Sequence, residues 1–118
     1  MKIVRVILSP EADEVLQHLE QFAKKRKQEK TLVNGFLQKS GYVKYNIHYG
    51  DAVAKDKIPL EYQIKYNADN LFRVEIPGFW RFTYTLKKNS SIDNEIIALV
   101  LDIMDHDTHN KKFGYKGK

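Results

Sequence analysis

Two arginines, Arg73 and Arg81, are the residues of this sequence whose type and spacing best suit the binding of a phosphate. They fall in two strand-like segments that flank Pro77-Gly78. Because side chains alternate between the faces of a strand, both arginines point away from the apolar residues of their segments. A guanidinium stays charged and grips phosphate oxygens in a fork. The pattern therefore predicts two arginines within reach of one phosphate. The alternative is that each pairs with a carboxylate, such as Glu75 or Asp102.

A polar segment that follows the last predicted strand reads Asp-His-Asp-Thr-His over residues 105–109. Histidine titrates near neutrality and therefore suits proton transfer. His106 is the first candidate for a general acid or base, and His109 is the second. Two other interpretations stay open: the histidines and aspartates form a metal-ligand set, or the segment is a solvated polar tail.

Several lysines suit contact with an anionic polymer. The formal net charge of +5, with 20 Lys+Arg against 15 Asp+Glu, favours phosphate-rich or acidic partners. The lysines that we expect to bind RNA form three pairs: Lys24 and Lys25, Lys55 and Lys57, and Lys111 and Lys112. The first pair belongs to a basic cluster, residues 24–30, which suits ribosomal RNA unless it is only a solvated helix end. The second pair lies in a long connection and suits phosphate binding or proton transfer. The third belongs to a basic tail.

Phe79 is expected on the same strand face as Arg81. An exposed aromatic ring at this point would stack on a base of single-stranded RNA. The alternative is that it lies at the rim of a surface covered by a protein partner.

The order of the predicted elements favours an α+β fold. Residues 2–8 form a strand, Ser9 and Pro10 begin a helix that runs to about residue 27, and a second helix covers 29–48. Residues 49–70 have no clean period, and strands follow at 71–76, 79–86 and 95–104. We expect one domain, residues 1–118, in which the N-terminal strand and a helical hairpin pack on one face of a small, mostly antiparallel four-stranded sheet.

The composition narrows the class of protein. Cysteine is absent, so neither disulfides nor thiolate metal sites are expected. The first residues show no apolar run typical of a signal peptide, and no stretch approaches the roughly 20 apolar residues that span a bilayer. We therefore expect a cytoplasmic protein that does not contact a membrane.

The stretch 70–84, NLFRVEIPGFWRFTY, resembles the aromatic and basic hairpin of the RelE/ParE toxin superfamily. Ser9-Pro10-Glu11-Ala12 resembles the entry of that family from its first strand into its first helix. The order β, α, α, β, β, β is also similar, so the resemblance covers nearly the whole chain. It implies that Arg73, Arg81 and His106 act on the scissile phosphate. Near the last of these the family often has a tyrosine; here the nearest position is His109, with Tyr115 further on.

The resemblance implies the toxin of a toxin–antitoxin pair, and its RNA-cleaving branch implies a ribosome-dependent mRNA endoribonuclease. Such an enzyme uses the ribose 2′-oxygen as nucleophile and needs neither metal nor cofactor. The expected partners are a cognate antitoxin protein, mRNA and the ribosome. Two other functions remain open: a gyrase inhibitor of the ParE type without nuclease activity, and an inactive relative that only binds RNA or a partner.

Overall fold

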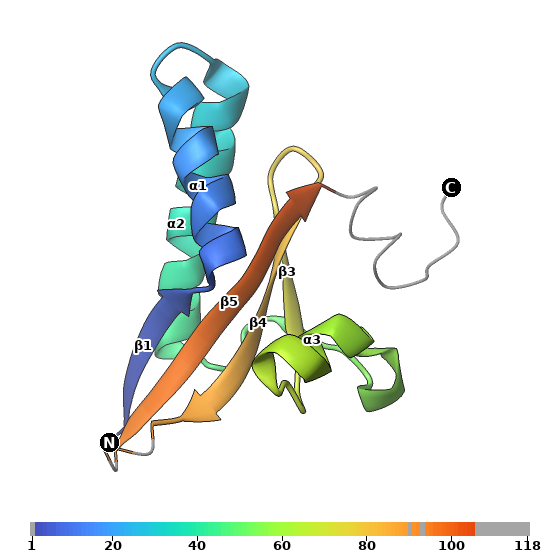
Figure 1. Ribbon diagram of the computed structural model, residues 1–118. Coiled ribbons are helices and arrows are strands. Elements are labelled where there is room, and N and C mark those ends of the chain that lie inside the picture. The colour runs from blue at the N-terminus through green and yellow to red at the C-terminus, as the bar shows by residue number, and fades with distance from the viewer. Residues whose placement is uncertain (1, 90, 93, 106–118) are drawn as a thin grey trace.

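The computed structural model describes residues 2–89, 91–92 and 94–105, and within them the chain has an α+β fold (Figure 1). The N-terminal half contains β1 (Ile3–Leu8), α1 (Pro10–Ala23) and α2 (Lys27–Tyr45). A connection follows that contains β2 (Asp51–Ala52), a 3₁₀ turn (Lys55–Lys57) and α3 (Leu60–Tyr66). The last three strands are β3 (Phe72–Ile76), β4 (Trp80–Lys88) and β5 (Glu95–Asp105).

The five strands form one mixed sheet in the order β1-β5-β4-β3-β2. Only β1 runs parallel to its neighbour, β5; the other three pairings are antiparallel. The mostly antiparallel character is therefore as predicted, but the predicted count of four strands is wrong. The additional strand, β2, has two residues, which pair with Arg73 and Phe72 of β3. A strand of two residues is too short to show the alternation by which strands are recognised.

Helix α1 begins where its sequence predicts. The Ser9 hydroxyl accepts a hydrogen bond from the backbone nitrogen of Ala12 at 3.0 Å, as an N-cap does. The same hydroxyl donates to the Leu101 carbonyl at 2.7 Å, so the helix start is tied to β5. Helix α2 ends at Tyr45, three residues earlier than predicted. There Asn46 turns the chain, and its side-chain oxygen accepts from the backbone nitrogen of His48 at 3.1 Å.

The helical hairpin of α1 and α2 covers one face of the sheet, which confirms the predicted packing (Figure 1). The alternate residues Phe72, Val74 and Ile76 of β3 are buried on this face. The rings of Phe36, on α2, and Phe82, on β4, meet edge to face with centroids 5.0 Å apart. This apolar face fixes the register of the hairpin strands, because a slip of one residue would expose it.

A second apolar layer on the opposite face was not predicted. Helix α3 lies there, and its Tyr62 is buried with Leu71 and Leu101 from the sheet (Figure 1). Leu101 is the extra residue of a β-bulge, since Tyr84 pairs with Val100 and Thr83 pairs with Asp102. The sheet is therefore covered on both faces near the middle of β4 and β5. Within the described residues, no helix has the length and apolar character needed to cross a bilayer.

Replacing Phe82 by alanine should lower the free energy of unfolding by about 3–5 kcal/mol, because its side chain is fully buried against the hairpin. Phe79→Ala is the matched control, since it removes the same ring from an 83% exposed position in the turn between β3 and β4. Urea unfolding followed by circular dichroism measures both. Equal destabilisation by the two changes would contradict the assignment of the faces.

Candidate functional site

Arg73 and Arg81 lie on neighbouring strands, on the sheet face opposite the helical hairpin, as the strand pattern predicts. Arg73 pairs across the strands with Thr83, and Arg81 pairs with Glu75. The two arginines are therefore diagonal neighbours, a relation that usually places Cβ atoms about 7–8 Å apart. Two guanidinium groups at this spacing can approach one phosphate and its neighbour.

Arg81 already has an anionic partner. Its Nη2 lies 3.0 Å from Oε1 of Glu75, and its side chain is only 15% exposed, whereas that of Glu75 is 72% exposed. The alternative interpretation, a carboxylate beside the arginine, therefore holds for Arg81. Any phosphate that binds there must displace the Glu75 carboxylate or share the guanidinium with it.

Two surface hollows meet at Glu75. The first has a volume of 320 Å³ and is lined by Glu75, Ile76, Gly78, Phe79, Trp80 and Arg81. The second has a volume of 250 Å³ and includes Arg73 and Lys39 in its wall. The Lys39 ammonium donates to the Glu75 carbonyl at 2.9 Å and so holds the outer edge of β3. Each hollow thus places one arginine beside the same carboxylate.

Phe79 lies in the β3–β4 turn, although the sequence predicted it as the first residue of a strand. Its φ is +62°, a left-handed conformation that a bulky residue adopts at a cost of about 1–3 kcal/mol. Its ring is 83% exposed at the mouth of the first hollow. The turn therefore presents an aromatic surface next to Arg81 that nothing in the hydrophobic core requires.

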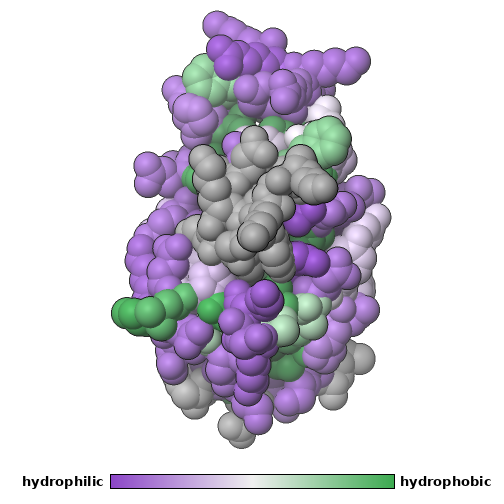
Figure 2. Space-filling model, turned by 90° about the vertical axis from the view of Figure 1, so that its right-hand side faces the viewer, coloured by the Kyte–Doolittle hydropathy of each residue, from purple (hydrophilic) through white to green (hydrophobic). Residues whose placement is uncertain are grey.

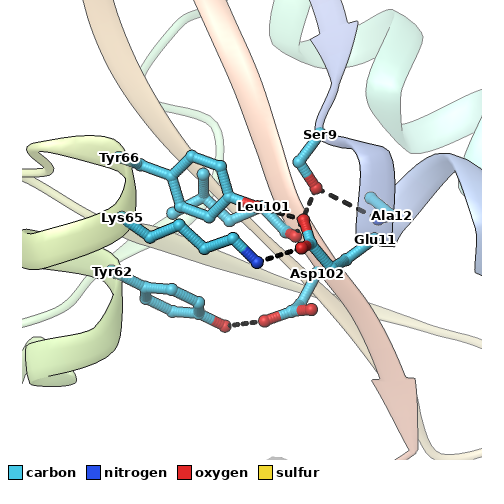
Figure 3. Close-up of polar contacts among 8 residues, drawn as sticks. All are labelled: Ser9, Glu11, Ala12, Tyr62, Lys65, Tyr66, Leu101 and Asp102. Atoms are coloured by element: carbon cyan, nitrogen blue, oxygen red, sulfur yellow. Dashed lines mark hydrogen bonds and ion pairs between the residues drawn. The ribbon is translucent and has the colours of Figure 1, made fainter.

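Helix α3 closes the middle of the same face through a tyrosine (Figure 3). The Tyr62 hydroxyl donates to Oδ2 of Asp102, and it lies 3.5 Å from the Thr83 hydroxyl. Burial and the nearby carboxylate raise the pKa of Tyr62 above its ordinary value, so the hydroxyl keeps its proton. Asp102 therefore has a neutral hydrogen-bond donor. Thr83, beside this contact, pairs with Arg73, so α3 lies next to that arginine, and Arg81 lies closer to the turn.

A second set of contacts joins α3 to the start of α1 (Figure 3). The Glu11 carboxylate accepts hydrogen bonds from the Lys65 ammonium and the Tyr66 hydroxyl. These two donors lower the pKa of Glu11 to about 2. The contacts fix α3 against the sheet and so set the boundary of the arginine face.

The other predicted RNA-binding residues do not gather at this face. Lys55 and Lys57 are exposed in the 3₁₀ turn, and Lys55 lines a separate hollow of 340 Å³ beside α3. Lys24 and Lys25 are exposed at the end of α1, in the wall of a hollow of 490 Å³. The remaining candidates lie outside the described residues: His106, His109, Lys111 and Lys112.

Three polar residues near the arginines had no predicted functional role: Glu75, Tyr62 and Asp102. Glu75 shares a face with Arg73 at a spacing of two, so its presence beside the arginines was detectable. The docking of Tyr62 on Asp102 joins segments 40 residues apart, and no local pattern reveals such a contact. In the described part of the chain, no group of three or more His, Asp or Glu side chains is arranged to hold a metal ion.

Comparisons with protein-family models, with curated proteins and with solved structures found no match.

The Glu11 contacts generate a prediction about acid stability. The folded-state pKa of about 2 lies below the ordinary carboxyl pKa of 4.5, so the stabilising contribution is fully present above pH 4.5. It is lost as the pH falls from 4.5 to about 2. Glu11→Gln should therefore lower the urea midpoint at pH 7, and its difference from the unmodified protein should shrink towards pH 2. Glu14→Gln, an exposed carboxylate in the same helix, controls for the loss of one charge. A difference independent of pH would contradict the prediction.

Proposed function

We propose that this chain is a RelE/ParE-type toxin that cleaves mRNA on the ribosome. The observation that supports this function best is the pair of arginines on neighbouring strands, with an exposed aromatic ring at the mouth of the hollow beside Arg81. The order of β1, α1, α2, β3, β4 and β5 agrees with the family resemblance of the sequence. The short β2 and α3 are additions within the connection between α2 and β3.

The chemistry requires three actions on the RNA. The ribose 2′-oxygen loses its proton and attacks the adjacent phosphorus, and the bond from phosphorus to the 5′-oxygen breaks. The products are a 2′,3′-cyclic phosphate and a 5′-hydroxyl end, so the proton taken at the start is balanced by the one given to the leaving oxygen. Arg81 and Arg73 stabilise the charge that develops on the phosphate oxygens. No metal ion is needed for this reaction.

His106 is the proposed acid or base, with His109 second. Asp105, the last described residue before them, pairs with Trp80 next to Arg81. The sequence thus continues into the histidines from the end of the sheet that holds the arginines. Phe79, in the adjacent turn, suits the stacking of a base that flanks the scissile phosphate.

The proposed partners follow from this role. A cognate antitoxin protein would cover the toxin in the cytoplasm until it is removed, and mRNA in the ribosome would be the substrate. A gyrase inhibitor or an inactive binding relative would use the same fold without Arg81 chemistry, and the following experiment distinguishes them.

Replacing Arg81 by alanine should lower the rate of RNA cleavage by about 10²–10³, because one preorganised charge at the phosphate is lost. Arg5→Ala is the matched control: Arg5 is also a strand arginine paired with a glutamate, Glu95 at 3.5 Å. His106→Ala should instead flatten the pH dependence of the rate. The measurement maps 5′-hydroxyl ends of cellular mRNA after brief expression without an antitoxin, and of the same RNA with purified ribosomes.

Cuts that disappear in Arg81→Ala and persist in Arg5→Ala support the nuclease. Intact RNA accompanied by DNA damage and stalled replication would contradict the nuclease function and favour the gyrase inhibitor. Absence of any toxicity at high expression would leave only the inactive binding relative.

A further inference from the structure

The basic cluster at the tip of the helical hairpin lies closer to the arginine hollow than its place in the sequence suggests. Residues 24–26 connect α1 to α2, and Lys27 and Lys30 lie in the first turns of α2. Leu32, two residues after Lys30, packs against Gly78 of the β3–β4 turn. A Cβ on Gly35 would lie 2.7 Å from Cδ of Pro77, and one on Gly78 would lie 3.1 Å from Cδ2 of Leu32. Figure 1 shows the α1–α2 connection and this turn at the same end of the molecule.

The distance along α2 from the basic cluster to the β3–β4 turn is short. An α-helix rises 1.5 Å per residue, so Lys30 lies about 8 Å along the helix axis from Gly35 and its contact with the turn. The hollow at the tip has a volume of 490 Å³ and extends from the connection along α2 to Thr31 and Asn34. The hollow beside Arg81 begins on the other side of the turn, at Gly78 and Phe79. The two hollows share no lining residue, but Asn34 of the tip hollow precedes Gly35, which lies against Pro77 of the turn.

The tip is strongly basic. Its five cationic side chains are exposed: Lys24, Lys25, Arg26, Lys27 and Lys30. Glu29 is the one carboxylate of this segment, and it pairs with Arg26 at 3.5 Å. Figure 2 shows hydrophilic side chains over this end of the molecule. A basic groove combined with an exposed aromatic ring is the usual composition of a surface that binds single-stranded nucleic acid.

We infer that the hairpin tip binds the same RNA strand that Arg81 engages. The strand passes from the arginine hollow over the ring of Phe79 to the lysines of α2, which hold phosphates several nucleotides from the reacting bond. This inference rests on the proposed function, because it extends the substrate site of the nuclease. It assigns the cluster to the substrate strand, and not to ribosomal RNA.

The test compares two lengths of RNA that cannot be cleaved. A 2′-O-methyl trinucleotide fills only the arginine hollow, whereas a 2′-O-methyl single strand of 12 nucleotides also reaches the tip. Blocking the 2′-oxygen makes binding independent of the chemistry, so failure of the nuclease function and failure of this inference remain separate results. Fluorescence anisotropy of the labelled RNA gives the dissociation constants as a function of salt.

The double variant Lys27→Ala/Lys30→Ala should weaken binding of the 12-nucleotide strand roughly 25-fold at 0.1 M salt. Loss of two phosphate contacts, each with a slope of about 0.7 for single strands, should also reduce the salt slope by about 1.4. Binding of the trinucleotide should change by less than about twofold. The matched control is Lys44→Ala/Lys88→Ala. It removes one exposed lysine near the C-terminal end of α2 and one at the C-terminal end of β4, and should leave the dissociation constants of both RNAs nearly unchanged.

Three results would overturn the inference. If both double variants weaken the long strand equally, only the net charge matters. If neither affects it, the lysines of the tip are a solvated helix end. If Lys27→Ala/Lys30→Ala weakens co-sedimentation with ribosomes but leaves the long strand unaffected, the cluster contacts ribosomal RNA.

Discussion

The close contact between α2 and the β3–β4 turn determines how the charged surfaces of this protein are arranged. Gly35 has no side chain, and a Cβ there would collide with Pro77. The turn therefore packs directly against α2 at Gly35. Gly78 and Phe79 both adopt positive φ, which turns the ring of Phe79 towards solvent at the end of the sheet. The same contact places the turn beside Gly35, about 8 Å along the helix axis from Lys30.

The second constraint is that the middle of β4 and β5 is covered on both faces. The hairpin helices bury one face, and α3 buries the middle of the other through Tyr62. Thr83 and Thr85 are fully buried for this reason, although threonine would also suit an open sheet face. The hollow beside Arg81 lies at the β3–β4 turn, whereas the hollow beside Arg73 lies along the outer edge of β3, next to Gly50 and Asp51. The bulge at Leu101 assists this arrangement, since it adds an apolar residue under α3 while Asp102 meets Tyr62.

These contacts explain which parts of the fold the sequence predicts. The hairpin strands and α1 follow from alternation, helical spacing and the Ser9 cap, all of which are local. Helix α3 has seven residues and an exposed apolar pair, Leu60 and Ile64, so its pattern is not that of an ordinary amphipathic helix. A non-local signal for it existed: β5 is apolar on both faces, which requires a second covering layer. Glu75 was named as a partner of the arginines, but which arginine it meets depends on strand register, and register follows from the length of the turn.

The ion pair between Glu75 and Arg81 is compatible with a phosphate-binding role for the arginine. Glu75 is largely exposed, whereas the side chain of Arg81 is only 15% exposed. The Glu75 carboxylate can therefore move into solvent, while the guanidinium of Arg81 stays at the border of the hollow. A phosphate offers the same fork of oxygens as a carboxylate and, in the proposed function, gains a second cation from Arg73. In the proposed function, this ion pair would hold Arg81 in place before RNA binds, which is the condition under which a charge contributes most to a transition state.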